Sequence, residues 1–139
     1  MDASLAPYHQ HHQELRRLAS HYESKLQPTL VREHPDLCLA DVQHLVSATK
    51  AHLAMENAVL FPALLMGQDE TVRAAAAALE SSLRELSTQL RQYGHHWTNA
   101  ETVRRAPEAF IAASLGLLRT LRHRIQEEAT SLFPLVERG

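Results

Sequence analysis

Apolar residues recur at spacings of three and four along most of the chain, which is the period of an amphipathic α-helix. The first stripe of this kind predicts a helix over residues 3–26, and its inward residues are Leu5, Tyr8, His12, Leu15, Ala19, Tyr22 and Leu26. Pro28 should end this helix, so we expect residues 27–36 to form a connector. One member of the buried stripe, His12, is therefore a titratable residue, with His9 and His11 beside it.

A second stripe predicts a helix from Asp36 to Met66, with Leu45, Thr49, His52, Glu56, Val59, Ala63 and Met66 facing inward. Pro62 should kink this helix near its end, because proline cannot donate the backbone hydrogen bond that a helix interior needs. The imidazole of His52 and the carboxylate of Glu56, four residues apart on one face, should both point into the core.

A third helix is predicted from Glu70 to Tyr93, capped by Asp69 and ended by Gly94. Its seam is apolar and consists of Val72, Ala76, Leu79, Leu83, Leu86, Leu90 and Tyr93, with Glu80 at the border. An irregular connector over residues 95–106 should follow, and a fourth helix should run from Pro107 to Val136. Four such helices predict an all-α fold, an up-down-up-down four-helix bundle forming one domain over residues 1–139.

Charge and composition narrow the function classes. The net charge is −2 with mixed signs, and no basic face is evident, so we expect no nucleic-acid partner. No apolar run is long enough to cross a membrane, and a single cysteine, Cys38, fits a reducing compartment, so we expect a cytoplasmic protein. The sequence contains no nucleophilic triad motif and no Gly-rich phosphate loop. The ten histidines are many for 139 residues, and they direct attention to metal binding.

The helical rise places His12, His52, Glu56 and Glu80 at about one level of the bundle. Buried charges are costly unless they are paired or bound to metal, and imidazole with carboxylate suits iron, manganese or zinc. The segment from His52 to Leu-Phe-Pro at residues 60–62 has a second copy, from His123 to Leu-Phe-Pro at residues 132–134. This copy adds the candidate ligands His123, Glu127 and Glu128.

The doubled His-x-x-x-Glu with Leu-Phe-Pro, together with the segment from His12 to Leu18, resembles the hemerythrin-like HHE cation-binding domains. The resemblance covers nearly the whole chain. It implies a four-helix bundle with a non-haem site for two iron ions, and a role in binding, sensing or handling dioxygen, nitric oxide or iron. The implied ligands are His12, His52 and His123, with Glu56 and Glu128 as bridging carboxylates. Tyr8 or Tyr22 could approach the site as a hydrogen-bond donor.

Two features depart from the family pattern. The third predicted helix has no histidine between Asp69 and Gly94, which leaves Glu80 as its candidate ligand. In the fourth helix, an ungapped match on Leu-Phe-Pro pairs Glu128 with Glu56 but pairs Arg124, not His123, with His52. A π-bulge between His123 and Glu128 would bring both inward. Without it, Arg124 would lie in the buried layer and could neutralise a carboxylate there.

We therefore expect a metal-binding protein whose partners are metal ions and a small diatomic ligand, with a homodimer as one candidate assembly. The metal should be iron, with zinc or manganese as alternatives. The competing hypothesis is a metal-free bundle that serves as an interaction or regulatory module, in which Arg124 replaces the metal charge. An enzymatic role has less support, because the sequence shows no substrate-pocket motif.

Overall fold

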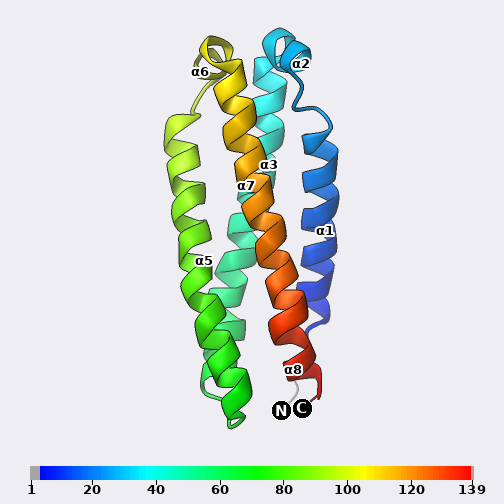
Figure 1. The fold of residues 1–139 in the computed structure, drawn as a ribbon, viewed down its shortest axis with the longest axis vertical. Helices are drawn as coiled ribbons and strands as arrows, with labels where there is room; N and C mark the ends of the chain where they lie inside the picture. The colour runs from blue at the N-terminus through cyan, green and yellow to red at the C-terminus, as the bar shows by residue number, and fades with distance from the viewer. Residues whose placement is uncertain (1–3, 139) are drawn as a thin grey trace.

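The computed structural model describes residues 4–138, and its four long helices lie side by side (Figure 1). They are α1 (Ala6–Glu23), α3 (Pro35–Met55), α5 (Glu70–His96) and α7 (Pro107–Glu127). The helices α1 and α5 each pack against both α3 and α7, so the four surround a common core. The described residues contain no strand, which confirms the predicted all-α bundle.

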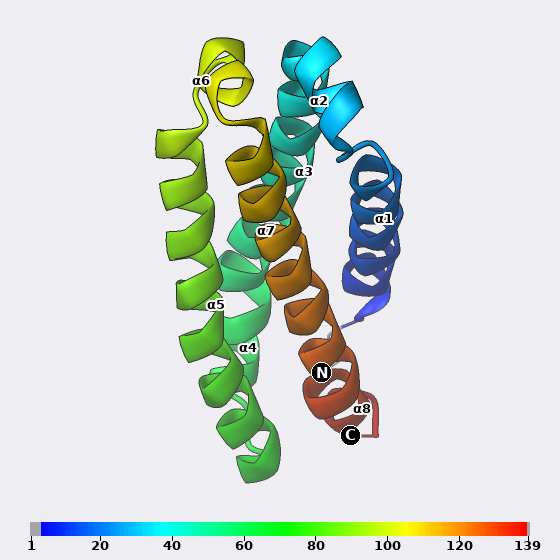
Figure 2. The same cartoon turned by 45° about the horizontal axis from the view of Figure 1, so that its top comes forward.

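The connections place the two ends of the bundle. Short helices α2 (Pro28–Glu33) and α6 (Ala100–Arg105) lie together at one end, and the chain termini lie at the other (Figure 1). The two remaining helices, α4 (Phe61–Leu65) and α8 (Phe133–Arg138), continue the lines of α3 and α7 (Figure 2). The two halves of the chain thus repeat one plan, a short helix, a long helix and a terminal helical extension.

The predicted stripes of α1 and α5 are confirmed residue by residue. All seven inward residues of the first stripe are buried, His12 among them, and so are all seven of the α5 seam. Asp69 caps α5 as expected, because its side chain accepts hydrogen bonds from the backbone N–H groups of Thr71 and Val72. These two helices follow the 3.6-residue period without interruption, so sequence spacing alone identifies their buried faces.

The connectors differ from the prediction. Pro28 does not simply end the first helix; it begins α2, where its missing N–H costs nothing. The segment predicted to be irregular contains α6, capped by the side chain of Asn99, which accepts from the Thr102 N–H. Gly94 does not stop α5, which continues to His96. Pro107 begins α7 as predicted.

Two π-helical segments are the main irregularities, η1 (Glu56–Leu60) and η2 (Glu128–Leu132). In each, the N–H of the following phenylalanine donates to the carbonyl of the glutamate five residues earlier. Pro62 and Pro134 come next, and a proline ring clashes with the carbonyl four residues before it. The wider π turn relieves that clash, so the proline that was expected to kink the helix instead sets a π turn.

The π turn also shifts which residues face the core. It inserts one extra residue, so the buried positions after Glu56 move one place along the chain. The prediction that Val59 and Met66 lie in the core is therefore wrong, because they are 60% and 87% exposed, and Ala63 is only half-buried. The residues that are buried there are Leu60, Phe61 and Leu64.

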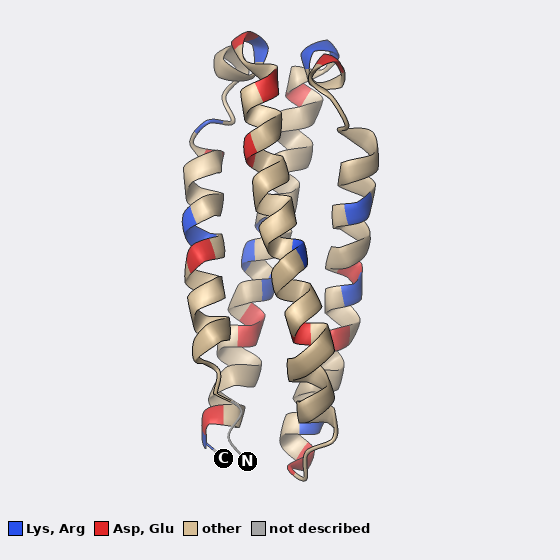
Figure 3. Ribbon diagram, turned by 180° about the vertical axis from the view of Figure 1, so that it is seen from behind, with Lys and Arg blue, Asp and Glu red and all other residues tan. Residues whose placement is uncertain are grey.

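Charged residues of both signs are distributed along the helices rather than gathered in one stripe (Figure 3). No helix in residues 4–138 is both long enough and apolar enough to span a membrane.

Candidate metal centre

Four buried side chains from separate parts of the chain converge inside the bundle, near the C-terminal ends of α3 and α7. His12 comes from α1, His52 from α3, Glu56 from the start of η1 and Glu128 from the start of η2. Each is at most 4% exposed, and one ligand atom of each lies within 4.8 Å of those of the others. We call this set the His/Glu cluster.

Direct contacts join the imidazoles to the carboxylates. His12 Nε2 lies 2.8 Å from Glu128 Oε1, and His52 Nε2 lies 3.3 Å from Glu56 Oε1. His52 Nε2 is also 3.9 Å from Glu128 Oε1, so Glu128 faces both histidines. Each ring therefore presents its Nε2 atom to the carboxylates.

The cluster leaves several buried polar atoms without partners among the described residues. They are His52 Nε2, both carboxylate oxygens of Glu56 and one oxygen of Glu128. A buried polar atom without a hydrogen bond costs about 1–3 kcal/mol, and more when it is charged. Since one ligand atom from each of the four residues lies within 4.8 Å of the others, a cation placed among them could bind all four residues together.

Burial and mutual contact shift the acidities in the cluster. Burial alone would lower the pKa of His52, but the carboxylates of Glu128 and Glu56 outweigh it and raise that pKa to about 9. Burial raises the pKa of Glu56, and the neighbouring Glu128 raises it further. Burial opposes ionisation of Glu128 too, but the hydrogen bonds with His12 and His52 keep its pKa below the ordinary range. Protons thus carry part of the charge compensation that a metal ion would supply.

Neighbouring rings hold the two histidines in place. His11 Nδ1 lies 3.1 Å from His52 Nδ1, and a hydrogen bond there leaves His52 Nε2 directed at the carboxylates. The ring of Phe133 stacks on the ring of His12, with centroids 5.2 Å apart and an interplanar angle of 14°. Metal-binding histidines are commonly oriented in this way by a hydrogen bond at the second ring nitrogen.

A cavity of about 360 Å³ between α1 and α3 reaches the cluster from the surface. His52 itself forms part of its wall, and the other lining residues are His11, Glu14, Leu15, Ala48, Ala51 and Met55. An ion or a small ligand could therefore reach His52 without unfolding the bundle.

Comparison with known protein families identifies the family to which this chain belongs. The family model of the hemerythrin HHE cation binding domain matches residues 5–136 of the chain. The chain belongs to the hemerythrin HHE family. No curated protein and no solved structure matches it. The family match and the buried His/Glu cluster together support a hemerythrin-like metal-binding protein.

The structure brings four of the seven predicted ligands of this hemerythrin-like protein together and leaves three elsewhere. The side chain of His123 is 73% exposed and lies 3.4 Å from Glu127 Oε1, on the outside of α7. Of the two alternatives for this helix, the π-bulge between His123 and Glu128 does not occur, because α7 stays α-helical to Glu127 and the π turn begins at Glu128. The register that aligns Arg124 with His52 is therefore the one that the structure adopts.

Arg124 is buried, but its partner differs from the one predicted. Its Nη1 atom lies 2.9 Å from Glu127 Oε1, and its Nε atom has no partner among the described residues. From the sequence, a buried Arg124 was expected to neutralise Glu56, Glu80 or Glu128. In the structure its guanidinium forms an ion pair with Glu127 instead. Glu127 is 34% exposed, so the pair lies at the border between core and solvent.

Glu80, the predicted ligand from the third long helix, also lies outside the His/Glu cluster. Its side chain is 34% exposed, and its Oε1 atom lies 3.5 Å from Arg84 Nη2 on the same helix. The buried face of α5 is lined by Leu79, Leu83 and Leu86 instead. α5, which has no histidine between Asp69 and Gly94, thus closes the core with apolar side chains.

The stacking of Phe133 on His12 was not predicted, although the sequence carries a signal for it. The repeated Leu-Phe-Pro was a sufficient signal, because a proline that sets a π turn also brings the preceding phenylalanine inward. Phe61 and Phe133 are both almost completely buried.

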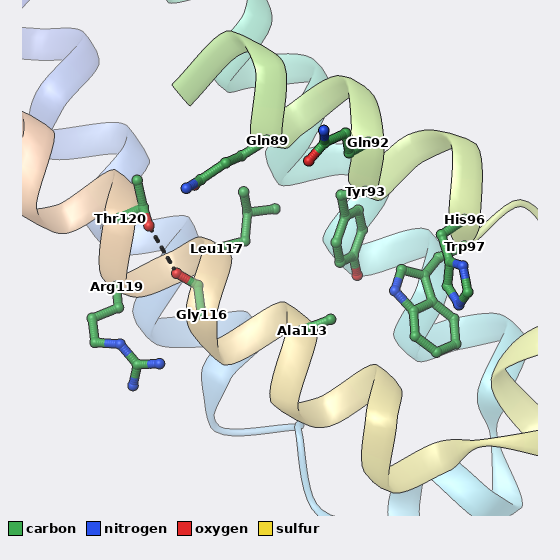
Figure 4. A pocket seen from close by; sticks show the side chains of 10 residues that line it. All are labelled: Gln89, Gln92, Tyr93, His96, Trp97, Ala113, Gly116, Leu117, Arg119 and Thr120. Atoms are coloured by element: carbon green, nitrogen blue, oxygen red, sulfur yellow. Dashed lines mark hydrogen bonds between the residues drawn. The ribbon is translucent and has the colours of Figure 1, made fainter. Parts of the chain in front are cut away.

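A second hollow, of about 620 Å³, opens between α5 and α7 (Figure 4). Gln89, Gln92 and Tyr93 line it from α5, and Gly116 and Thr120 line it from α7. Thr120 precedes Glu128 by eight residues, roughly 12 Å along the helix. This hollow is therefore separate from the His/Glu cluster.

Proposed function

We propose that this hemerythrin-like protein binds non-haem iron at the His/Glu cluster and uses it to bind or sense a small diatomic molecule such as dioxygen or nitric oxide. The observation that carries the proposal is the convergence of two buried histidines and two buried glutamates, whose ligand atoms lie within 4.8 Å of one another and include His52 Nε2 and Glu56 oxygens that have no hydrogen bond. Two imidazoles and two carboxylates suit iron, and also manganese or zinc.

The surroundings support a small ligand rather than a bulky substrate. The cavity between α1 and α3 is mainly apolar, apart from His11, Glu14 and His52, and it borders the cluster at His52. Bound iron supplies an open coordination position and electrons for a diatomic ligand. The chain's own residues hold the ion, orient the two imidazoles and limit access from water.

The metal-free alternative is less well supported. It requires Arg124 to compensate the buried carboxylates, but Arg124 pairs with Glu127, and neither oxygen of Glu56 accepts a hydrogen bond. Whether the centre takes the two iron ions that the family resemblance implies is a separate proposal, which depends on the charge of Arg124.

Anaerobic loading with ferrous iron tests the proposal. Purified metal-free protein would be loaded, desalted and analysed for bound metal, with manganese and zinc in parallel. We expect retained iron, and a change in the visible spectrum when nitric oxide or air is added. A chain that retains none of the three metals would contradict the proposal.

The chain offers a matched control for this experiment. The double variant His52→Ala with Glu56→Ala should lose the metal. The variant His123→Ala removes a histidine from the exposed side of α7 and should retain the metal, and Glu127 is kept because it pairs with the buried Arg124.

A further inference from the structure

We propose that the centre holds a single metal ion and that Arg124 excludes a second one. This inference rests on the proposed function, because it concerns how many ions the same cluster accepts.

Arg124 occupies in α7 the position that His52 occupies in α3. Each is buried, and each lies four residues before the glutamate that begins a π turn. Residues four apart share a helix face, so the two side chains stand in the same relation to Glu128 and Glu56. Where the α3 half supplies an imidazole, the α7 half supplies a cation that cannot lose its proton and cannot bind a metal.

Charge compensation favours one ion. A single divalent ion balances the two carboxylates, Glu56 and Glu128, while Arg124 is balanced by Glu127. A second divalent ion would leave two positive charges uncompensated in the core, and the α7 residue one helical turn before Glu128 is the cation Arg124 rather than a further ligand or anion. Uncompensated buried charge is unfavourable, because solvation is lost without a replacement.

The number of ligands leads to the same conclusion. The four ligand atoms all lie within 4.8 Å of one another, so they can surround one ion and give it four protein ligands. Two ions would have to share these four side chains, with one imidazole each. Neither α5 nor α7 adds a histidine, since the inward face of α5 is apolar and His123 points outward.

The experiment is a metal count on the wild-type chain and on Arg124→His, by native mass spectrometry and elemental analysis of the loaded protein. We expect one ion per wild-type chain and two per Arg124→His chain, since this change removes the cation and supplies the missing imidazole. Arg119→His, an exposed arginine on the same helix, is the control and should keep one ion.

Electron paramagnetic resonance gives an independent readout after oxidation. A single ferric ion has half-integer spin and gives a strong signal, whereas two bridged ferric ions couple to an even-electron pair with no such signal. Wild type should therefore give the signal at full intensity, and Arg124→His should lose it.

The outcomes separate the two proposals. No bound ion in wild type would overturn the proposed function itself. Two ions per wild-type chain would overturn the single-ion inference and leave the metal function intact, whether or not Arg124→His folds. One ion in wild type and one in a folded Arg124→His, checked by circular dichroism, would overturn the role assigned to Arg124.

Discussion

The α3 half and the α7 half of the molecule share a backbone plan but differ in chemistry. Each ends in a glutamate, a π turn and Leu-Phe-Pro, and each buries its glutamate completely. Four residues before that glutamate, α3 carries His52 and α7 carries Arg124. The first residue can bind a metal ion and the second repels one.

This difference shows that the repeated backbone and the ligand set are specified separately. The π turn depends on proline and glutamate positions that both halves keep, so it survives without a full set of ligands. The imidazole depends on one side chain, which only the α3 half provides. A duplicated motif therefore predicts duplicated geometry more safely than duplicated chemistry.

The largest expected effect is a difference in metal affinity between substitutions of His52, from the α3 half, and of His123, from the α7 half. His52→Ala should weaken metal binding by at least on the order of 100-fold, because losing a ligand costs more than losing its supporting partner. His123→Ala should leave the affinity unchanged, since this side chain is exposed. Isothermal titration with zinc and ferrous iron measures both. Equal losses in the two variants would show that α7 contributes its histidine after all.

The next effect concerns the pH dependence of the metal-free protein. The folded-state pKa of His52 is raised to about 9 from an ordinary 6.5, so its stabilisation is fully present below pH 6.5 and is lost as the pH rises towards 9. The raised pKa of Glu56 acts in the same direction. We expect the free energy of unfolding to fall by about 3 kcal/mol or more over that range.

Denaturant titrations of chelator-treated protein across this pH range measure the loss. The metal-loaded protein is the comparison, and its loss should be smaller, because the ion replaces the protons. A metal-free protein whose stability is flat or rises from neutral to alkaline pH would contradict this account of the cluster.

At the acidic end, the lowered pKa of Glu128 predicts a separate loss of stability as the pH falls below about 4.5.

The smallest expected effect is a difference in metal affinity between substitutions of Phe61 and Phe133, the phenylalanines of the two Leu-Phe-Pro segments. Phe61→Leu and Phe133→Leu should each cost about 1–2 kcal/mol of stability, as near-isosteric core changes do. Only Phe133→Leu should also weaken metal binding, by roughly tenfold, because Phe133 stacks on His12 and fixes its orientation. Thermal unfolding and metal titration of both variants test this. Equal metal affinities in the two variants would remove the supporting role from Phe133.

Sequence spacing predicted the fold and most of the core, because α1 and α5 keep one helical period throughout. It failed after Glu56, where the π turn shifts the register and moves Val59 and Met66 to the surface. A proline indicates that a helix must adjust, but not whether it kinks or widens.

The site was predictable in part for the same reason. His12, His52, Glu56 and Glu128 follow from periodicity and from the repeated motif, and the structure groups these four. Arg124 was correctly aligned with His52, but its partner could not be read from the sequence. Glu127 is available to it only because Glu127 lies half-buried on the adjoining face of α7.

The His/Glu cluster also has a consequence for biosynthesis. Its members range from residue 12 to residue 128 of a chain of 139, and the bond between His12 and Glu128 joins the first long helix to the last. On a ribosome, the full His/Glu cluster exists only after Glu128 has been synthesised. A fragment that stops before Glu128 should therefore bind no metal ion at this cluster, because it lacks the carboxylate that contacts both His12 and His52.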